Sequence, residues 1–287
     1  MTARAPNLGK FGAWLNPVHN DDDRLRFAEE AADLGYNTVW LGCGVERMVD
    51  LDLPRRLLER IEGVAVATAV VNIWTNPASQ LAATYKHLVE RFGARLVLGL
   101  GLGHPESIDH YKRPYTKLVE YLDELDAAGV PKQARLIGAL GPKTITLAGQ
   151  RAAGVHPYLT TPAHTRYSRE LLGDGPIVAP EHMVAVGYGP EEGRQVGRPA
   201  VQHPYLSRTN YRSNLIRQGF NESDMAGAGS DRLIDALVYH GDAKTVAGQL
   251  HAHLDAGADH VAIQSLAPQN GDPMPGLRQL AEPLGLG

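Results

Sequence analysis

The sequence contains very little cysteine, little net charge and no long apolar run. Cys43 is the one cysteine among 287 residues, so no disulfide can form within the chain, and a reducing compartment such as the cytoplasm is expected. The formal net charge of −4 argues against a nucleic-acid-binding surface. No apolar run reaches the length that crosses a membrane, and residues 1–6 lack the apolar centre of a signal peptide. We therefore expect a cytoplasmic protein that binds neither nucleic acid nor membrane.

Between Gly63 and Pro105, the sequence predicts a unit that consists of a strand, a helix and a second strand. Residues 64–72 form an unbroken apolar run, which is typical of a parallel strand covered on both faces. Asn76 and Pro77 are expected to begin the helix, with the Asn76 side chain accepting from the first-turn N–H groups. Gly93 is expected to end it.

The second strand of this unit carries a glycine on every other residue. Gly99, Gly101 and Gly103 alternate with leucines, so one face of the strand is bare backbone that something must approach closely. The pattern is not the dinucleotide fingerprint G-x-G-x-x-G, because His104 stands where the third glycine belongs and the glycines lie inside a strand. The glycines either relieve crowding inside a closed barrel or face a ligand, and both interpretations can hold together.

Strand and helix alternate along most of the chain. Strands are expected at residues 8–15, 38–41, 64–72, 95–103, 135–140, 155–159, 177–186 and 260–266. Residues 187–240 are less regular, with helical pieces at Glu191–Val196 and Tyr211–Arg217. This count predicts an α/β fold, a TIM-type (β/α)8 barrel in a single domain of residues 1–287, with an insertion of about residues 187–240 between the last two strands. An open doubly wound sheet is the main alternative.

In such a barrel the chemistry lies at the carboxyl ends of the strands. No lysine is expected there, which argues against a Schiff-base aldolase, and no close pair of Asp or Glu is expected on adjacent strand ends. The 12 histidines form no His-Glu-x-x-His pattern, and we expect no metal site. A site with so few acid–base groups is better suited to a cofactor that carries its own chemistry. The helix start at Gly141, Pro142 and Lys143 would suit a phosphate, although it can equally be a simple capping turn.

Five motifs carry a resemblance to a known family. They are Gly35–Trp40 (GYNTVW), Ala67–Asn72 (ATAVVN), Leu98–Pro105 (LGLGLGHP), Ala139–Pro142 (ALGP) and Asp255–Val261 (DAGADHV). Together, and in this order, they resemble the luciferase-like monooxygenase superfamily, and within it the actinobacterial oxidoreductases that use the deazaflavin coenzyme F-420. The resemblance runs over nearly the whole chain.

The resemblance implies a barrel, usually a homodimer, that binds a flavin or deazaflavin across the strand ends. It implies a non-proline cis peptide behind the cofactor ring, which maps to Ala69 and Val70. The residues expected to bind the cofactor are Ala69, Val70, Asn72, Gly101, Gly103, His104, Ala139, Leu140, Gly141 and Pro142. The insertion at residues 187–240 is expected to cover the site.

One departure from the family concerns acid–base chemistry. Several deazaflavin dehydrogenases of this family carry an Asp-His pair after the second strand, where this chain has Gly42, Cys43 and Gly44. His104, His156 and Tyr158 are therefore the candidate catalytic residues. Trp14 and Asn16 are candidates for the substrate side.

These observations lead to three functional hypotheses. The first is an oxidoreductase that transfers a hydride between coenzyme F-420 and an unidentified small organic substrate. The second is an FMN-dependent monooxygenase on the same barrel, and the third is a barrel that binds flavin without catalysis. F-420 differs from FMN by an acidic lactyl-oligoglutamate tail, for which Arg47, Lys112, Arg113 and Lys143 are the candidate cations.

Overall fold

The computed structural model describes residues 7–43, 49 and 51–287. The strands are β1 (Phe11–Leu15), β2 (Thr38–Gly42), β3 (Ala65–Ala69), β4 (Val71–Asn72), β5 (Leu96–Gly101), β6 (Arg135–Gly138), β7 (Gly154–Val155), β8 (Ile177–Val178), β9 (Glu181–Val186), β10 (Val238–Gly241) and β11 (Val261–Ser265). The α-helices are α1 (Asp21–Asp33), α2 (Asp52–Arg60), α3 (Ala78–Phe92), α4 (Pro114–Ala127), α5 (Pro142–Arg151), α6 (Pro162–Leu172), α7 (Pro190–Gln202), α8 (Thr209–Arg217), α9 (Asp231–Leu237), α10 (Ala243–Asp255) and α11 (Met274–Ala281). The short 3-10 helices are η1 (Pro105–Ser107), η2 (Lys132–Ala134), η3 (Tyr205–Ser207) and η4 (Pro268–Asn270).

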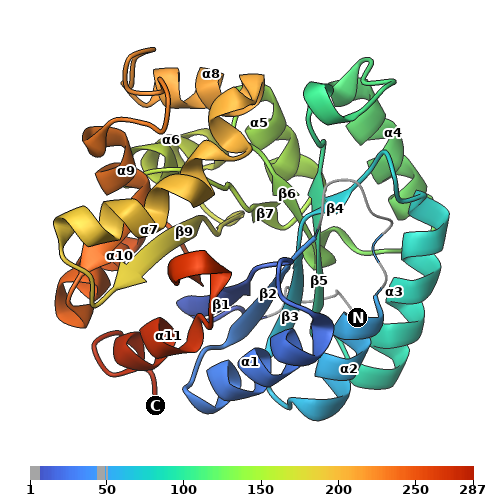
Figure 1. Ribbon diagram of the computed structural model, residues 1–287. Coiled ribbons are helices and arrows are strands. Elements are labelled where there is room, and N and C mark those ends of the chain that lie inside the picture. The colour runs from blue at the N-terminus through green and yellow to red at the C-terminus, as the bar shows by residue number, and fades with distance from the viewer. Residues whose placement is uncertain (1–6, 44–48, 50) are drawn as a thin grey trace.

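The strands form one curled parallel sheet in the order β10-β9-β11-β1-β2-β3-β5-β6-β7-β8, with β4 also paired to β5. The segment that contains β8 and β9 forms backbone hydrogen bonds with neighbouring strands on both sides. Ala179 N donates to Val155 O on β7 at 3.0 Å, and Ala262 N on β11 donates to Pro180 O at 2.9 Å. The sheet thus curls until β7 and β11 lie on the two sides of this segment, β10 extends the sheet from β9, and helices surround it (Figure 1). This architecture is consistent with the expected TIM-like barrel.

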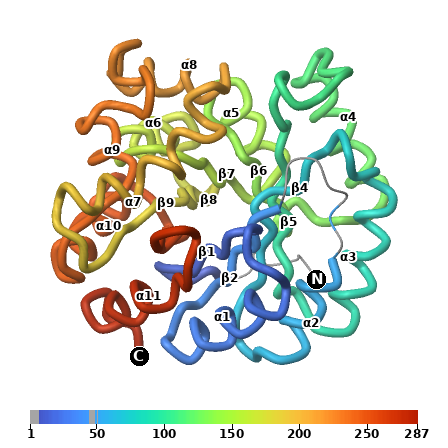
Figure 2. Tube along the Cα trace, viewed as in Figure 1, coloured from blue at the N-terminus to red at the C-terminus, as the bar shows by residue number. Residues whose placement is uncertain are grey.

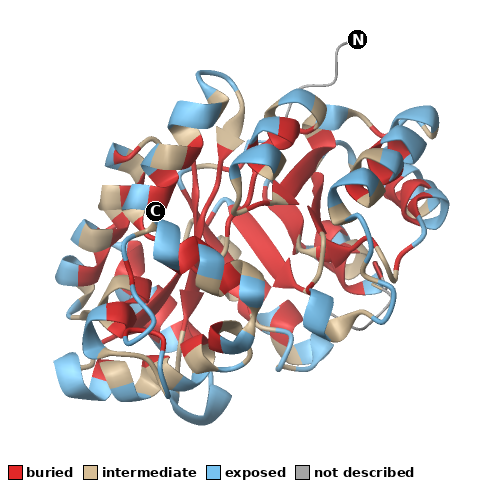
Figure 3. Cartoon of the chain, turned by 90° about the horizontal axis from the view of Figure 1, so that it is seen from above, coloured by how far each residue is buried: buried red, intermediate tan, exposed pale blue. Residues whose placement is uncertain are grey.

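Burial follows the layers of the molecule. The strands are buried on both faces, while the surrounding helices expose their outer sides (Figure 3). Trp14, Trp40 and Ala67 pair across β1, β2 and β3 and belong to one buried cluster, which fills the inside of the curled sheet. A separate and larger cluster lies between the sheet and the helices. The apolar runs of the sequence are explained by these two cores.

Three local expectations are wrong. The Asn76 side chain does not cap α3, because its Oδ1 accepts from Val49 N and its Nδ2 donates to Asn72 O at 2.8 Å. The apolar run 64–72 is divided into β3 and β4 at Val70. Residues 238–241 form β10, which pairs in parallel with β9 and was not predicted. Within the part of the chain that the structure describes, no helix combines the length and apolarity needed to cross a membrane.

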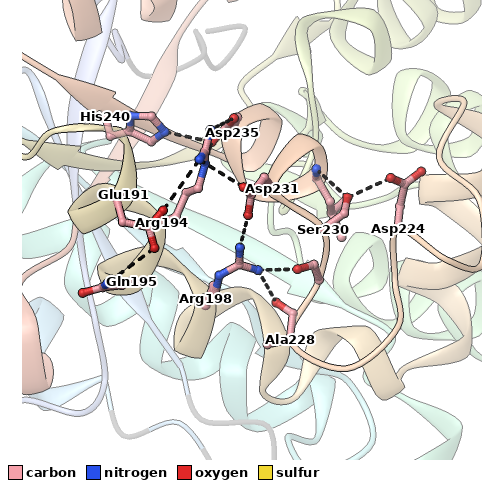
Figure 4. A network of polar contacts seen from close by, with 12 residues as sticks. Glu191, Arg194, Gln195, Arg198, Asp224, Ala228, Ser230, Asp231, Asp235 and His240 are labelled. Carbon is pink, nitrogen blue, oxygen red and sulfur yellow. Dashed lines mark hydrogen bonds and ion pairs between the residues drawn. The ribbon is translucent and has the colours of Figure 1, made fainter.

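The segment from residue 187 to residue 240 has an ionic network of its own and shares a hydrophobic core with Leu159 and β9. Its helices pack through Val201, Leu215 and Leu233 against Met183 of β9. Figure 4 shows the network that joins α7 to α9 and β10: Arg194 on α7 forms two 2.7 Å hydrogen bonds to the carboxylate of Asp235 on α9. His240 contacts the same carboxylate at 2.9 Å. Figure 2 shows the trace of this segment in yellow to orange, from α7 beside β9 to α8 and α9.

Candidate functional site

A cavity of about 500 Å³ lies at the carboxyl ends of the strands. One part of its wall comes from the ends of β1, β3, β5 and β6, and another from η3 and α8 in the 187–240 segment. Of the sequence-predicted site residues, those that line it are Trp14, Asn16, Ala69, Val70, Asn72, Gly101, Gly103, His104, Ala139, Leu140, Gly141, His156 and Tyr158. Pro142 begins α5 beside the cavity and is not part of its wall. The structure therefore brings nearly all of these residues to one place.

The glycines of β5 face the bulge between β3 and β4. The peptide bond between Ala69 and Val70 is cis, as the resemblance implied. A Cβ placed on Gly99 would lie 2.0 Å from Thr68 O, and one placed on Gly101 would lie 2.3 Å from Val70 Cγ2. Gly101 and Gly103 also line the cavity. The glycines thus relieve crowding, because the bare face admits the bulge, and the interpretation that they also face a ligand stays a prediction.

Replacing Gly101 by alanine should push Val70 out of position. A side chain forced into a packed interior typically costs about 1–3 kcal/mol, so the melting temperature should fall by several degrees. Gly138→Ala is the matched control, because its Cβ would lie 3.5 Å from Val70 Cγ1, an ordinary contact. Thermal unfolding of both variants checks this, and equal melting temperatures would show that Val70 can move freely.

An anion-binding corner lies at the N-terminus of α5. Gly141 is the N-cap residue, no side chain caps the helix, and a Cβ placed on Gly141 would meet no heavy atom within 4 Å. The first-turn N–H groups of a helix attract anions. Thr144, Ser213 and Arg217 line the cavity together with Gly141, and Arg217 Nη2 lies 3.4 Å from Leu140 O. Two elements thus bring a guanidinium, two hydroxyls and a helix N-terminus together.

Two buried polar atoms in the cavity wall have no partner among the described residues. They are Nε1 of Trp14, a donor, and Nε2 of His156. His156 Nδ1 lies 2.8 Å from Ala179 O, so this nitrogen carries the proton and Nε2 is an acceptor. The ring stacks on Trp40 at 4.0 Å. Burial lowers the pKa of His156 to about 3, so its ring is neutral and is not a proton donor at neutral pH.

His104 lies where the strand ends meet α8. Its Nδ1 is 3.1 Å from Asn210 Oδ1, and the neighbouring Glu106 carboxylate accepts from Thr209 N and Thr209 Oγ1 at 2.9 and 2.8 Å. These contacts hold the start of α8 against the loop after β5. Burial lowers the pKa of His104, so the imidazole is neutral at neutral pH. His104 therefore positions α8 as well as lining the cavity.

Three tyrosines form an aromatic part of the cavity wall. Tyr158, Tyr205 and Tyr211 pack with ring centroids 5.0, 4.9 and 6.3 Å apart, and Trp14 lies 5.7 Å from Tyr158. The Tyr158 hydroxyl donates to Gln264 Oε1 at 3.0 Å. Burial raises the pKa of Tyr158 and Tyr211 well above 10 and that of Tyr205 to about 12. This wall therefore offers neutral hydroxyls and aromatic faces.

Sequence reasoning missed the residues that the 187–240 segment contributes, namely Pro204, Tyr205, Asn210, Tyr211, Ser213 and Arg217. The helical pattern of residues 211–217 was visible, but nothing in it indicates which strand ends the helix will cover. Of the cations considered for an acidic tail, Lys112, Arg113 and Lys143 are exposed and lie outside the cavity wall. Arg47 lies outside the described residues.

No protein-family model matches the chain, and no curated protein matches it. Solved structures do match. The coenzyme F-420-dependent tetrahydromethanopterin reductase from Methanopyrus kandleri is 15% identical with a TM-score of 0.76, and the match covers 97% of this chain and 99% of that one. An F-420-dependent secondary alcohol dehydrogenase, solved with an adduct of F-420 and acetone, is 13% identical with a TM-score of 0.74, covering 98% and 99%.

A third match is the oxygenating constituent of 3,6-diketocamphane monooxygenase from Pseudomonas putida, in complex with FMN. It is 13% identical with a TM-score of 0.68, and the match covers 96% of each chain. The chain therefore has the fold of the luciferase-like oxidoreductases and monooxygenases that the sequence motifs indicated.

Proposed function

We propose that this chain, with its luciferase-like fold, is an oxidoreductase that transfers a hydride between the deazaflavin coenzyme F-420 and a small organic substrate. The observation that carries the proposal is the composition of the cavity. Its wall combines the anion-binding corner, the Ala69–Val70 bulge and the uncharged aromatic rings of the three tyrosines. This combination suits a molecule that carries both a phosphate and a flat ring.

The anion-binding corner fits a ribityl phosphate. Gly141 leaves open space in front of α5, and Thr144, Ser213 and Arg217 supply further donors and one positive charge. Trp14 and His156 also line the cavity, with Nε1 of Trp14 and Nε2 of His156 buried within its wall. When bound, the deazaflavin supplies or takes up the hydride.

The roles of this chain's own residues follow from their places. Val70 and Ala69 would lie behind the ring and keep it flat against the opposite wall. Trp14, Tyr158 and Tyr211 would enclose the substrate and exclude water, which strengthens hydrogen bonds inside the cavity. Asn16 lines the same cavity, on the substrate side in this proposal. We also propose that residues 187–240 are an insertion that covers the site, and that the protein is a cytoplasmic homodimer.

An FMN-dependent monooxygenase is the second candidate. The FMN complex among the structures of the same fold favours it, and the anion-binding corner does not discriminate, because FMN and F-420 share the ribityl phosphate. Reactivity with oxygen separates the two, since a deazaflavin transfers hydride but reacts poorly with oxygen. A barrel that binds flavin without catalysis is the third candidate, and tight binding with no turnover of any donor would favour it.

The purified protein should bind coenzyme F-420 at least about tenfold more tightly than FMN, a difference of about 1.4 kcal/mol. The expected cause is attraction between the acidic tail and the exposed Lys112, Arg113 and Lys143. Salt screens such contacts, so the preference should narrow as salt is raised. Parallel fluorescence titrations at low and high salt measure this. Equal affinities, or a preference for FMN, would favour the monooxygenase.

A further inference from the structure

His104 and Asn210 form a side-chain contact between the sheet and α8 within the cavity wall. Both residues line the cavity, His104 after the end of β5 and Asn210 in the first turn of α8. His104 Nδ1 lies 3.1 Å from Asn210 Oδ1. An amide oxygen can only accept a hydrogen bond, so Nδ1 carries the single ring proton of the neutral histidine. The other ring nitrogen, Nε2, therefore keeps its lone pair.

The Nε2 atom of His104 is open to the cavity. It has no hydrogen-bond partner among the described residues, and unlike Nε2 of His156 it is not enclosed by protein atoms. His104 as a whole is only 8% exposed. Because the residue is otherwise buried and lines the cavity, the accessible nitrogen is an acceptor that a bound molecule can reach.

A second contact fixes the place of Asn210. The N-cap residue of α8, Arg208, makes no side-chain cap. Glu106, from the loop after β5, takes that role, because its Oε1 accepts from Thr209 N at 2.9 Å and from Thr209 Oγ1 at 2.8 Å. A carboxylate at a helix N-terminus stabilises the first turn. The turn that carries Asn210 is thus held against the loop that carries His104.

His104 follows the part of β5 that packs against the Ala69–Val70 bulge. A Cβ placed on Gly101 would lie 2.3 Å from Val70 Cγ2, and Gly101, Gly103 and His104 line the same cavity. In the proposed function the cofactor ring lies against this bulge, so His104 would stand near the edge of the ring. The pyrimidine part of a flavin or deazaflavin ring carries one N–H group, a donor that suits a nitrogen lone pair.

We propose that Asn210 is a positioning residue that fixes His104 as the Nδ1–H tautomer, and that His104 Nε2 then accepts a hydrogen bond from the ring N–H of the bound cofactor. The acceptor role rests on the proposed function, whereas the tautomer does not. Burial lowers the pKa of His104, so the ring stays neutral at neutral pH and Nε2 retains the lone pair that this role requires.

The first test reads the tautomer in the cofactor-free protein. Nuclear magnetic resonance of protein labelled with ¹⁵N in its histidine rings should show His104, assigned by its loss in His104→Gln, with a proton on Nδ1 and none on Nε2. His156 is an internal control, because its Nδ1 lies 2.8 Å from Ala179 O. Asn210→Ala should give a mixture of tautomers at His104 only. A proton on Nε2 in the parent, or an unchanged tautomer in Asn210→Ala, would overturn the proposal.

A charge at residue 210 tests the same contact in a second way. In Asn210→Asp a carboxylate would face His104 Nδ1 and stabilise the protonated ring, so the pKa of His104 should rise by about 1–3 units. Ser207→Asp adds the same charge at an exposed position in η3 and should raise that pKa much less. The same spectra, recorded from pH 5 to pH 8.5, measure both. Equal pKa values in the parent and Asn210→Asp would contradict the contact.

The acceptor role is tested with FMN, because its ring carries the same N–H as that of coenzyme F-420. Bound FMN should move the Nε2 resonance of His104 toward that of a hydrogen-bonded nitrogen, whereas N3-methyl FMN, which lacks the N–H, should not. No shift with FMN bound, or equal shifts with both ligands, would overturn the acceptor role. Binding of neither FMN nor coenzyme F-420 would defeat the proposed function and the acceptor role together, while the tautomer would still be decided by the first test.

Discussion

Replacing Gly141 by aspartate is expected to lower the affinity for FMN or coenzyme F-420 at least about a hundredfold. The backbone at Gly141 has a φ of −100° and a Cβ there meets no atom within 4 Å, so the aspartate fits without a clash. Its charge would lie where the phosphate is expected. Two like charges about 4 Å apart repel by roughly 4 kcal/mol at an effective dielectric of 20, which exceeds a hundredfold in affinity even after partial screening.

Two variants at the same position isolate the charge. Gly141→Ala tests the side chain alone, and Gly141→Asn has nearly the shape of aspartate without its charge. Both should bind within a few fold of the parent in a fluorescence titration. Unchanged affinity for Gly141→Asp would remove the N-terminus of α5 from the binding site, while an equal loss for Gly141→Asn would indicate a steric cause.

Acidification should unfold the protein at a pH of about 5. His156, His164, His182, His253 and His260 are at most 2% exposed, and burial lowers the pKa of each: to about 3 for His156 and His253, to about 4 for His164 and His260, and well below 6.5 for His182. Below pH 6.5 the unfolded chain binds protons that the folded chain does not. Stability is therefore complete above pH 6.5 and is lost between 6.5 and the folded values.

The size of this loss of stability follows from the number of buried histidines. Each histidine contributes about 1.4 kcal/mol per pH unit, so the five together approach roughly 7 kcal/mol per unit. Burial raises the pKa of Glu181 to about 8, so this residue acts with the opposite sign and reduces the slope by about 1.4 kcal/mol per pH unit. A domain is typically stable by about 5–15 kcal/mol, so a fall of about one to three pH units below 6.5 suffices, which is near pH 5 for a domain of middle stability.

Urea unfolding between pH 7.5 and pH 5 measures the slope of stability against pH. His253→Gln should reduce that slope by about 1.4 kcal/mol per pH unit, even if it lowers stability overall, because one buried histidine is gone. His87→Gln, at an exposed position on α3, should leave the slope unchanged. A flat profile down to pH 5 would show that these histidines take up protons within the folded state.

The order of the elements could be predicted because apolar runs and their glycine or proline boundaries are local properties. The Ala69–Val70 cis bond was expected from the family resemblance, since no local pattern of small residues specifies it. The expected Asn76 cap was wrong because its side chain bonds to Val49 and Asn72 instead, and Val49 is distant in sequence. β10 was missed because Val238–Gly241 is too short to show a pattern, and it forms only against β9.

The same distinction between local patterns and distant contacts applies to the candidate site. Asn16, Asn72 and His156 were predicted because they stand at expected strand ends, where the architecture itself selects them, whereas Gly101 came from the glycine pattern and the family resemblance. Tyr205, Tyr211 and Arg217 could not be predicted because the fold brings them over the cavity from a segment about 50 residues or more beyond the nearest strand end that they meet.

Residues 187–240 have an ionic network of their own but share a hydrophobic core with Met183 and Ala185 of β9. In the proposed function, the sheet provides the wall behind the cofactor ring, and the segment adds Tyr205, Asn210 and Tyr211 to the cavity. The ionic contacts of Arg194 and Arg198 with Asp231 and Asp235 lie within the segment itself. Under the proposed function, an engineer who wants a new substrate can therefore vary Tyr205, but should keep Thr209 and Asn210, because they bond to Glu106 and His104 after β5.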